Sequence, residues 1–167
     1  ITADPIQSEA QLDETLSRPS TQLIESMKRL RGDILILGVS GKVGPTLAEA
    51  AIRAVEASGV HRRVIGVSSF NTKGSRQRLD KMGVHTVKAD LTADGAFDEL
   101  PDADNVMYMV GRKFGSTGAE WATWMINVHL AGLAARRYRN ARLVAFSSGN
   151  IYPFLPVGSG GATEATP

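Results

Sequence analysis

The chain of 167 residues contains no cysteine. This absence excludes a disulfide framework, a thiolate metal site and a cysteine nucleophile. The sequence also has no apolar run long enough to span a bilayer. Its first twenty residues carry acidic side chains instead of the apolar stretch of a secretory signal. Together these absences favour a cytoplasmic enzyme or binding protein that does not enter a membrane.

The chain has little surplus charge of either sign. Its 19 Lys and Arg residues stand against 17 Asp and Glu residues, which leaves a formal net charge of +2. So small a surplus argues against a nucleic acid or a membrane surface as the partner. The three histidines, His61, His85 and His129, lack metal-ligand spacing, so we predict no metal site.

Short apolar runs alternate with stretches of helical periodicity along most of the chain. The expected strands are 34–37, 64–67, 85–88, 106–110 and 143–146. The expected helices are one ending near Gly59, one at 76–82 and a long one at 120–138, and the segment 96–100 is expected to form at most a short helix. Strands that alternate with helices indicate βαβ units and a parallel sheet. The predicted fold class is therefore α/β, a Rossmann-type doubly wound parallel sheet with an N-terminal helical extension.

A glycine-rich turn follows the first expected strand. Gly38, Gly41 and Gly44 lie between that strand and the next helix, with the spacing G-x-x-G-x-x-G. The first glycine permits a tight turn, the second lets the backbone approach a pyrophosphate, and the third lets the helix pack on the strand. The helix N-terminus adds N–H groups and partial positive charge. The turn predicts a dinucleotide site formed by Gly38, Ser40, Gly41, Lys42, Val43 and Gly44.

These patterns divide the chain into three parts. Residues 1–31 are predicted to form a helical extension that Pro19 interrupts. Residues 32–155 are predicted to form a dinucleotide-binding Rossmann domain. Residues 156–167 are glycine-rich and are expected to form a loop or a truncated tail.

Three further features accompany the glycine turn. They are Ala89-Asp90-Leu91 after the third strand, Asn127-Val128 inside the long helix, and Phe146-Ser147-Ser148-Gly149-Asn150-Ile151-Tyr152 after the fifth strand. In this order, over residues 33–152, the four features resemble the extended short-chain dehydrogenase/reductase family, the group of NAD-dependent epimerases and dehydratases. The resemblance implies hydride transfer between a nicotinamide cofactor and a keto or hydroxy substrate, for which a nucleotide sugar is one candidate.

The resemblance also implies a catalytic role for Ser148. This residue matches the family's serine that hydrogen-bonds the substrate carbonyl or hydroxyl, whereas Tyr152 belongs to the same pattern and is expected to pack the loop. The family's catalytic Tyr-x-x-x-Lys pair does not occur in this sequence, and the family places it downstream of Ser148. We therefore expect this chain to position a cofactor with its catalytic set incomplete.

The end of the second strand bears on the choice of cofactor. Ser68 and Ser69 stand where NAD enzymes usually place an acid that bonds the ribose 2′-hydroxyl. Neither serine repels a 2′-phosphate, both can bond one, and Arg76 can pair with one. The expected cofactor is NADP or NAD, with NADP favoured. The alternative for Arg76 is a place on a solvated helix face.

Two later strand ends contribute further candidate residues. The resemblance places Asp90 and Leu91 beside the adenine, although Asp90 is also suited to capping the next segment. Gly111 lets the backbone after the fourth strand approach the cofactor. Arg112 and Lys113 are unexpected there, and they either contact phosphate or an anionic substrate or lie on a solvated loop.

The long helix at 120–138 is apolar on nearly all sides. Trp121, Trp124, Met125 and Val128 share one face. A helix of this kind is buried on two sides, and the sheet accounts for only one of them. We expect a second copy of the chain to cover the other side in a homodimer, the alternative being burial under a further part of the protein.

Three functions are consistent with these patterns. The first is an enzyme, an oxidoreductase or an epimerase/dehydratase. The second is a non-catalytic dinucleotide-binding sensor or interaction module, which a downstream Tyr-x-x-x-Lys pair would argue against. The third is a methyltransferase on a related sheet, for which Ser68 is unfavourable because such enzymes place an acid at that position.

Overall fold

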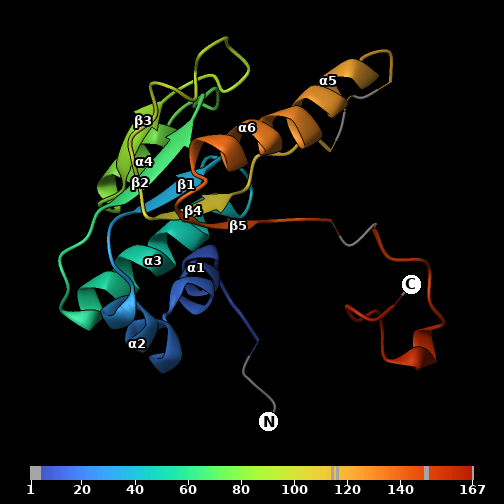
Figure 1. Cartoon of the computed structure of the whole chain (residues 1–167). Coiled ribbons are helices and arrows are strands. Elements are labelled where there is room, and N and C mark those ends of the chain that lie inside the picture. Colours follow the sequence, from blue (N-terminus) through green and yellow to red (C-terminus); the bar gives the residue numbers. More distant parts are fainter. Residues whose placement is uncertain (1–4, 114, 116, 149–150, 167) are drawn as a thin grey trace.

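The fold is a parallel sheet with helices on both faces, as Figure 1 shows. The computed structural model describes residues 5–113, 115, 117–148 and 151–166. The strands of this described part are β1 (Ile34–Leu37), β2 (Val64–Ser68), β3 (His85–Lys88), β4 (Asn105–Tyr108) and β5 (Arg142–Ala145). Every neighbouring pair is parallel in the order β3-β2-β1-β4-β5. The predicted Rossmann-type α/β fold is confirmed.

The strand order contains one reversal, between β1 and β4. From β1 the chain moves outward through β2 to β3, then returns to β4 and moves outward again to β5 on the other side. Crossovers on the two sides leave the sheet by opposite faces, so a crevice opens at the carboxyl ends of β1 and β4. This edge is where the glycine-rich turn lies.

Helices cover the two faces of the sheet unequally. The helices α3 (Gly44–Ser58) and α4 (Ser75–Lys81) lie on one face, and α6 (Leu130–Arg137) lies on the other. Figure 1 shows α3 below the sheet, and above it α6 with α5 (Glu120–Trp124) continuing outward from its far end.

The core has two layers because successive side chains of a strand point to opposite faces. In β1, Ile34 and Ile36 pack with α3 and α4, whereas Leu35 and Leu37 pack with α6. All four are at most 1% exposed. The continuous apolar run that predicted this strand is therefore explained by burial on both faces, as in a parallel sheet between two helix layers.

The N-terminal extension forms two helices, α1 (Glu9–Ser17) and α2 (Thr21–Arg29). Ser8 and Ser20 cap them by accepting hydrogen bonds from backbone N–H groups of the first turn. Met27 of α2 is 3% exposed and shares the core layer of α3. An ion pair of 2.7 Å joins Glu14 of α1 to Arg53 of α3. The extension therefore packs against α3, and Met27 contributes to the core beside it.

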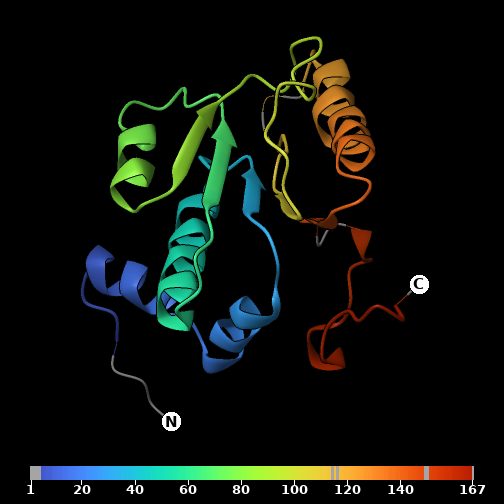
Figure 2. The same ribbon diagram turned by 60° about the vertical axis from the view of Figure 1, so that its left-hand side comes forward.

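Two segments differ from the sequence-based expectation. The helix predicted over 120–138 has a π-helical turn, Met125–His129, between α5 and α6, which periodicity alone does not reveal. The segment 96–100 forms turns instead of a short helix. A 3₁₀ turn, Val157–Ser159, lies in the tail, and in both Figure 1 and Figure 2 this tail runs away from the sheet. Among the helices of the described residues, none has the length and apolar character needed to cross a membrane.

Candidate dinucleotide site

The glycine-rich turn connects β1 directly to α3. Gly38 adopts a φ of 85°, a left-handed conformation that favours glycine. Its N–H donates to the Val67 carbonyl oxygen at 2.9 Å, so the turn is tied to the end of β2. A Cβ on Gly38 would lie 3.1 Å from the backbone of Met109 and Val110, at the end of β4. The first glycine therefore lets three strand ends approach one another.

The third glycine allows α3 to begin close to β1. A Cβ on Gly44 would lie 2.1 Å from the Val39 carbonyl oxygen, a distance that no side chain can occupy. The second glycine is less crowded, because a Cβ on Gly41 would meet only the Gly38 carbonyl oxygen, at 3.2 Å. The turn is compact at Gly38 and Gly44 and open in the middle, where a ligand would approach.

The N-terminus of α3 is suited to an anion. Val43 precedes the helix, and its side chain has no acceptor with which to cap it. Pro45, in the first turn, has no N–H to satisfy. The positive end of the helix dipole is therefore left to an external group. Lys42 is exposed beside it, and its ammonium group adds positive charge to this end of the helix.

Ser40 and Ser68 join the glycine turn to the end of β2. Their hydroxyl groups form a short hydrogen bond, and Ser68 is 9% exposed. Ser69 follows and is half-buried. Phe70, next along the chain, has a φ of 51°, which is unusual for a bulky residue and is often found at functional sites.

Arg76 contacts both Phe70 and β3. Its guanidinium carbon lies 5.9 Å from the centre of the Phe70 ring, a cation–π distance. Its Nε donates to the Thr86 hydroxyl at 2.9 Å. The guanidinium is thus held over the segment that follows β2, on the side of β3.

Asp90 and Leu91 follow β3 and have different surroundings. Leu91 is 7% exposed and belongs to the core layer of α6. Asp90 is exposed, and its Oδ1 accepts hydrogen bonds from the Thr92 hydroxyl and backbone N–H at 2.6 and 2.9 Å. These two bonds hold the pKa of Asp90 below its ordinary value. The carboxylate caps the following turn, as the alternative interpretation of Asp90 proposed.

The loop after β4 is anchored by a residue that the sequence analysis did not place in the site. Asn127, in the π-helical turn, accepts the Arg112 backbone N–H at 2.7 Å and donates to the Arg112 carbonyl oxygen at 2.9 Å. Gly111 lies beside this contact, and a Cβ there would make only an ordinary van der Waals contact with Asn127 Oδ1, at 3.7 Å. The available sequence signal was the Asn-Val pair in the long helix.

The π-helical turn makes a second contact with β4. The hydroxyl of Tyr108 donates to the Ile126 carbonyl oxygen at 3.2 Å. Burial raises the pKa of Tyr108 to about 12, so this hydroxyl keeps its proton at neutral pH. Together with Asn127, this bond fixes the helix against the carboxyl end of β4. Such π turns are frequent at functional sites.

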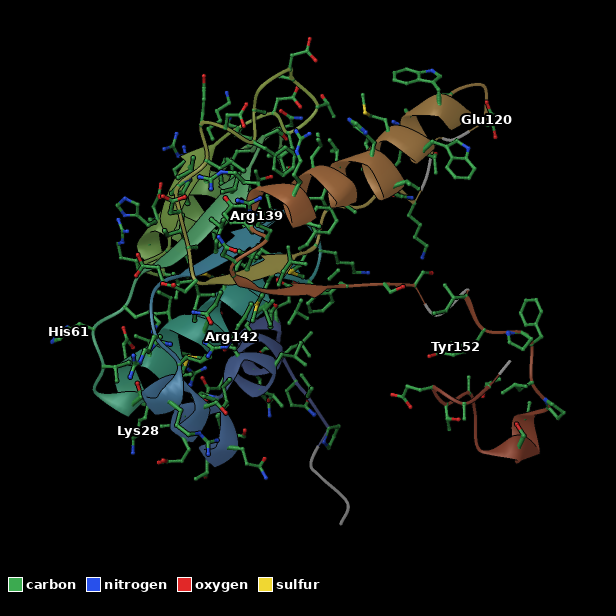
Figure 3. All side chains as sticks on the ribbon, viewed as in Figure 1. Lys28, His61, Glu120, Arg139, Arg142 and Tyr152 are labelled. Atoms are coloured by element: carbon green, nitrogen blue, oxygen red, sulfur yellow. The ribbon has the colours of Figure 1, made fainter. Side chains whose placement is uncertain are left out.

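Ser148 lies just beyond the end of β5. The Phe146 N–H still donates to the Tyr108 carbonyl oxygen at 2.9 Å, so β4 and β5 run side by side up to this point. Ser148 is exposed, and its carbonyl oxygen accepts the Ile151 N–H at 3.3 Å. In Figure 3 Tyr152 lies further along the tail, apart from the sheet.

Two hollows of the surface lie away from the glycine turn. One is at the amino edge of the sheet, lined by Gly32, Asp104 and Tyr138 among others. The other separates the segment 91–98 from the helical residues Met125 and Leu133. Within the described part of the chain, no group of three or more His, Asp or Glu side chains is placed to hold a metal ion.

A parallel sheet with one reversal, a glycine turn at that reversal and an open helix N-terminus define the class of Rossmann-type dinucleotide-binding proteins. Residues 34–167 match the model of the NAD dependent epimerase/dehydratase family. The chain belongs to this family, and the resemblance inferred from four sequence motifs is confirmed. A search among curated proteins found no match. Membership supports NAD-dependent oxidoreductase or epimerase activity in general terms.

Proposed function

We propose that the glycine turn binds the pyrophosphate of NAD or NADP at the N-terminus of α3. The observation that carries this proposal is the close fit of Gly44 against Val39, because it brings the first turn of α3 to the carboxyl end of β1. Gly41 then faces the open middle of the turn, where it admits the phosphates. The residues present fit the cofactor: glycine backbone for the pyrophosphate, and hydroxyls at the end of β2 for the ribose.

The proposed chemistry is hydride transfer with a keto or hydroxy substrate. When bound, the nicotinamide ring supplies or accepts the hydride. Ser148, at the end of β5, hydrogen-bonds the substrate oxygen, and the loop after β4 borders the same edge. A nucleotide sugar is one substrate that this scheme admits. The Tyr-x-x-x-Lys pair to which the family resemblance assigns the acid–base step does not occur in this sequence.

We further propose that the cofactor is NADP. The Ser40–Ser68 pair places two hydroxyls, and no carboxylate, beside the expected ribose position. Arg76 is held nearby over Phe70, where its positive charge favours a 2′-phosphate. An acid at position 68 would repel that phosphate and bond a 2′-hydroxyl instead.

Substitution Ser68→Asp tests the site and the preference together. Titration with NADPH and with NADH should give tighter binding of NADPH to the parent chain. In the variant the ratio should fall by roughly tenfold or more. Ser26→Asp on α2 is the matched control and should leave the ratio unchanged. Equal affinities in the parent chain, or an unchanged ratio in S68D, would refute the preference for NADP.

A non-catalytic dinucleotide sensor is the second candidate, because the sequence contains no Tyr-x-x-x-Lys pair. Oxidation of bound NADPH in the presence of a panel of carbonyl compounds separates the two candidates. An enzyme should show oxidation that Ser148→Ala reduces by tenfold or more. Because this sequence lacks the family's acid–base pair, the assay uses the protein as it is expressed naturally, and cofactor binding there without any oxidation would favour the sensor.

The homodimer is a further proposal, supported by an uncovered apolar face on α5 and the π-helical turn. Trp121, Trp124 and Val128 are 72%, 69% and 55% exposed. Replacing both tryptophans by Gln should convert a dimer into a monomer in analytical ultracentrifugation. A monomeric parent chain would contradict the proposal. The cytoplasmic location expected from the sequence stays a prediction.

A further inference from the structure

We infer that Arg112 is a specificity-determining residue that binds an anionic group of the substrate. This inference rests on the proposed function, because it places the substrate at the carboxyl edge of the sheet. It adds a class of substrate: a keto or hydroxy compound that carries a carboxylate or a phosphate near the reacting carbon.

The position of Arg112 follows from the register of two strands. Tyr108 of β4 pairs with Ala145 of β5, and one further backbone hydrogen bond continues this pairing to Phe146. Counted from the Tyr108–Ala145 pair, Ser148 corresponds to Gly111, the residue before Arg112. Arg112 and Ser148 therefore leave neighbouring strands at the same edge. A substrate oxygen held by Ser148 would have Arg112 close to its adjoining group.

The backbone of Arg112 is held unusually firmly for a loop residue. Both its N–H and its carbonyl oxygen are bound by the single amide of Asn127, at 2.7 and 2.9 Å. Asn127 itself lies in the π-helical turn, which the Tyr108 hydroxyl fixes to β4. The Asn127 amide therefore holds the Arg112 backbone directly, and the Tyr108–Ile126 hydrogen bond holds the turn that carries Asn127. Such support is what a group that must meet a ligand in a fixed geometry requires.

The guanidinium of Arg112 has hydrogen-bonding capacity that the described residues do not use. Its Nη2 donates to the Gly115 carbonyl oxygen at 2.5 Å. Its Nε is buried and makes no hydrogen bond to any described residue. A buried donor without an acceptor is unfavourable and calls for a partner. An anion with two oxygens satisfies Nε and Nη2 together, in the forked geometry that arginine forms with carboxylates and phosphates.

The matching variants are Arg112→Gln and Arg112→Lys. Gln removes the positive charge, and Lys keeps the charge but loses the fork. Arg139→Gln is the control, because it removes the same charge from an exposed residue just after α6. Figure 3 shows Arg139 at the opposite end of the helical segment from Glu120. Asn127→Leu is a second route to the same site, since it releases the backbone of Arg112 without changing its side chain.

The experiment measures binding of malonate and of inorganic phosphate to the full chain saturated with NADPH, by calorimetry. We expect R112Q to weaken binding of the preferred anion by about tenfold or more. R112K and N127L should weaken it less, and R139Q should leave it unchanged. Preference for malonate identifies a carboxylate substrate, and preference for phosphate identifies a phosphorylated one.

Two results would overturn the inference. One is that the NADPH-saturated chain binds neither anion. The other is that R112Q lowers the melting temperature while anion affinity is unchanged, which would make Arg112 a brace of its own loop. If R112Q does not fold, an unchanged anion affinity in N127L would overturn it in the same way. A chain that fails to bind NADPH at all contradicts the proposed function, so the two failures are distinguishable.

Discussion

The two edges of the sheet are held together by different kinds of interaction. At the amino edge, side chains bridge the elements: Asp33 at the start of β1 binds Arg63 before β2 at 2.6 Å, and Asn105 of β4 donates to the Arg31 carbonyl oxygen at 2.8 Å. At the carboxyl edge, the elements meet through glycine backbone at Gly38 and Gly44. The bridges of the amino edge include an ion pair, whereas the closest approaches at the carboxyl edge are between backbone segments, and the side-chain contacts there, such as Ser40–Ser68, add to them.

This difference indicates that the amino edge of the sheet contributes mainly to folding stability, whereas the carboxyl edge also forms the cofactor site. The Asp33 carboxylate and the Asn105 amide nitrogen are bound within the protein, although the buried Asn105 Oδ1 has no partner among the described residues, so a ligand would have to break these bonds. The carboxyl edge instead leaves the first turn of α3 uncapped and brings three strand ends together at Gly38. Changes at the amino edge should therefore affect folding alone, whereas changes at the carboxyl edge should also affect the cofactor.

The largest expected effect is that of Gly44→Ala. The new methyl group would lie 2.1 Å from the Val39 carbonyl oxygen, so α3 must move away from β1. We expect the free energy of unfolding in urea to fall by roughly 3 kcal/mol or more, with loss of cofactor binding. Gly132→Ala on α6 is the control, since a Cβ there meets nothing within 4 Å. Equal stability of the two variants would refute the close approach.

A smaller effect is expected for Asn127→Asp. The carboxylate keeps the acceptor for the Arg112 N–H but cannot donate to the Arg112 carbonyl oxygen. Loss of this hydrogen bond should loosen the loop after β4, where Gly111 is expected to approach the cofactor, and the cost of about 1 kcal/mol should be seen as a several-fold weaker affinity for NADPH. Melting temperature should change little, because the side chain is exposed. A large loss of stability with intact NADPH affinity would mean that Asn127 stabilises the fold and does not support the cofactor site.

The smallest effect is expected at the amino edge, for Asp33→Asn. Burial acts to raise the pKa of Asp33, but its hydrogen bonds and ion pair with Arg63 outweigh this and lower the pKa from 3.8. A lowered pKa means that the stabilisation is complete above the unfolded value and is lost as pH falls through the folded value. At pH 7 we expect the variant to lose roughly 0.5 kcal/mol of stability without a change in NADPH affinity.

The pH dependence supplies the check on this third prediction. Urea unfolding of both chains between pH 7 and pH 2 should give a constant difference at the upper end, which shrinks below about pH 4 as the parent carboxylate is protonated. A difference that grows with acidity would mean that the bridge does not stabilise the folded state.

The sequence predicted the strands and the glycine turn well because their signals are local. The run Ile34–Leu37 is apolar on both faces, and Gly38, Gly41 and Gly44 lie directly between this strand and the next helix. Contacts between distant segments were harder to predict. Asn127 and Arg112 are joined through a π turn, and no periodicity marks such a turn. The capping of Thr92 by Asp90 depends on a loop conformation that admitted both interpretations of this acid.

The central claim is that the glycine turn is a phosphate-binding site. The most direct test is a calorimetric titration of NADPH and NADH into the parent chain and into Gly41→Asp, with Gly132→Asp as the control for the same added charge. We predict binding by the parent chain and by G132D, and loss of binding by a folded G41D, because a carboxylate at Gly41 repels the pyrophosphate. Undiminished binding in G41D would show that the cofactor lies elsewhere and would contradict the account.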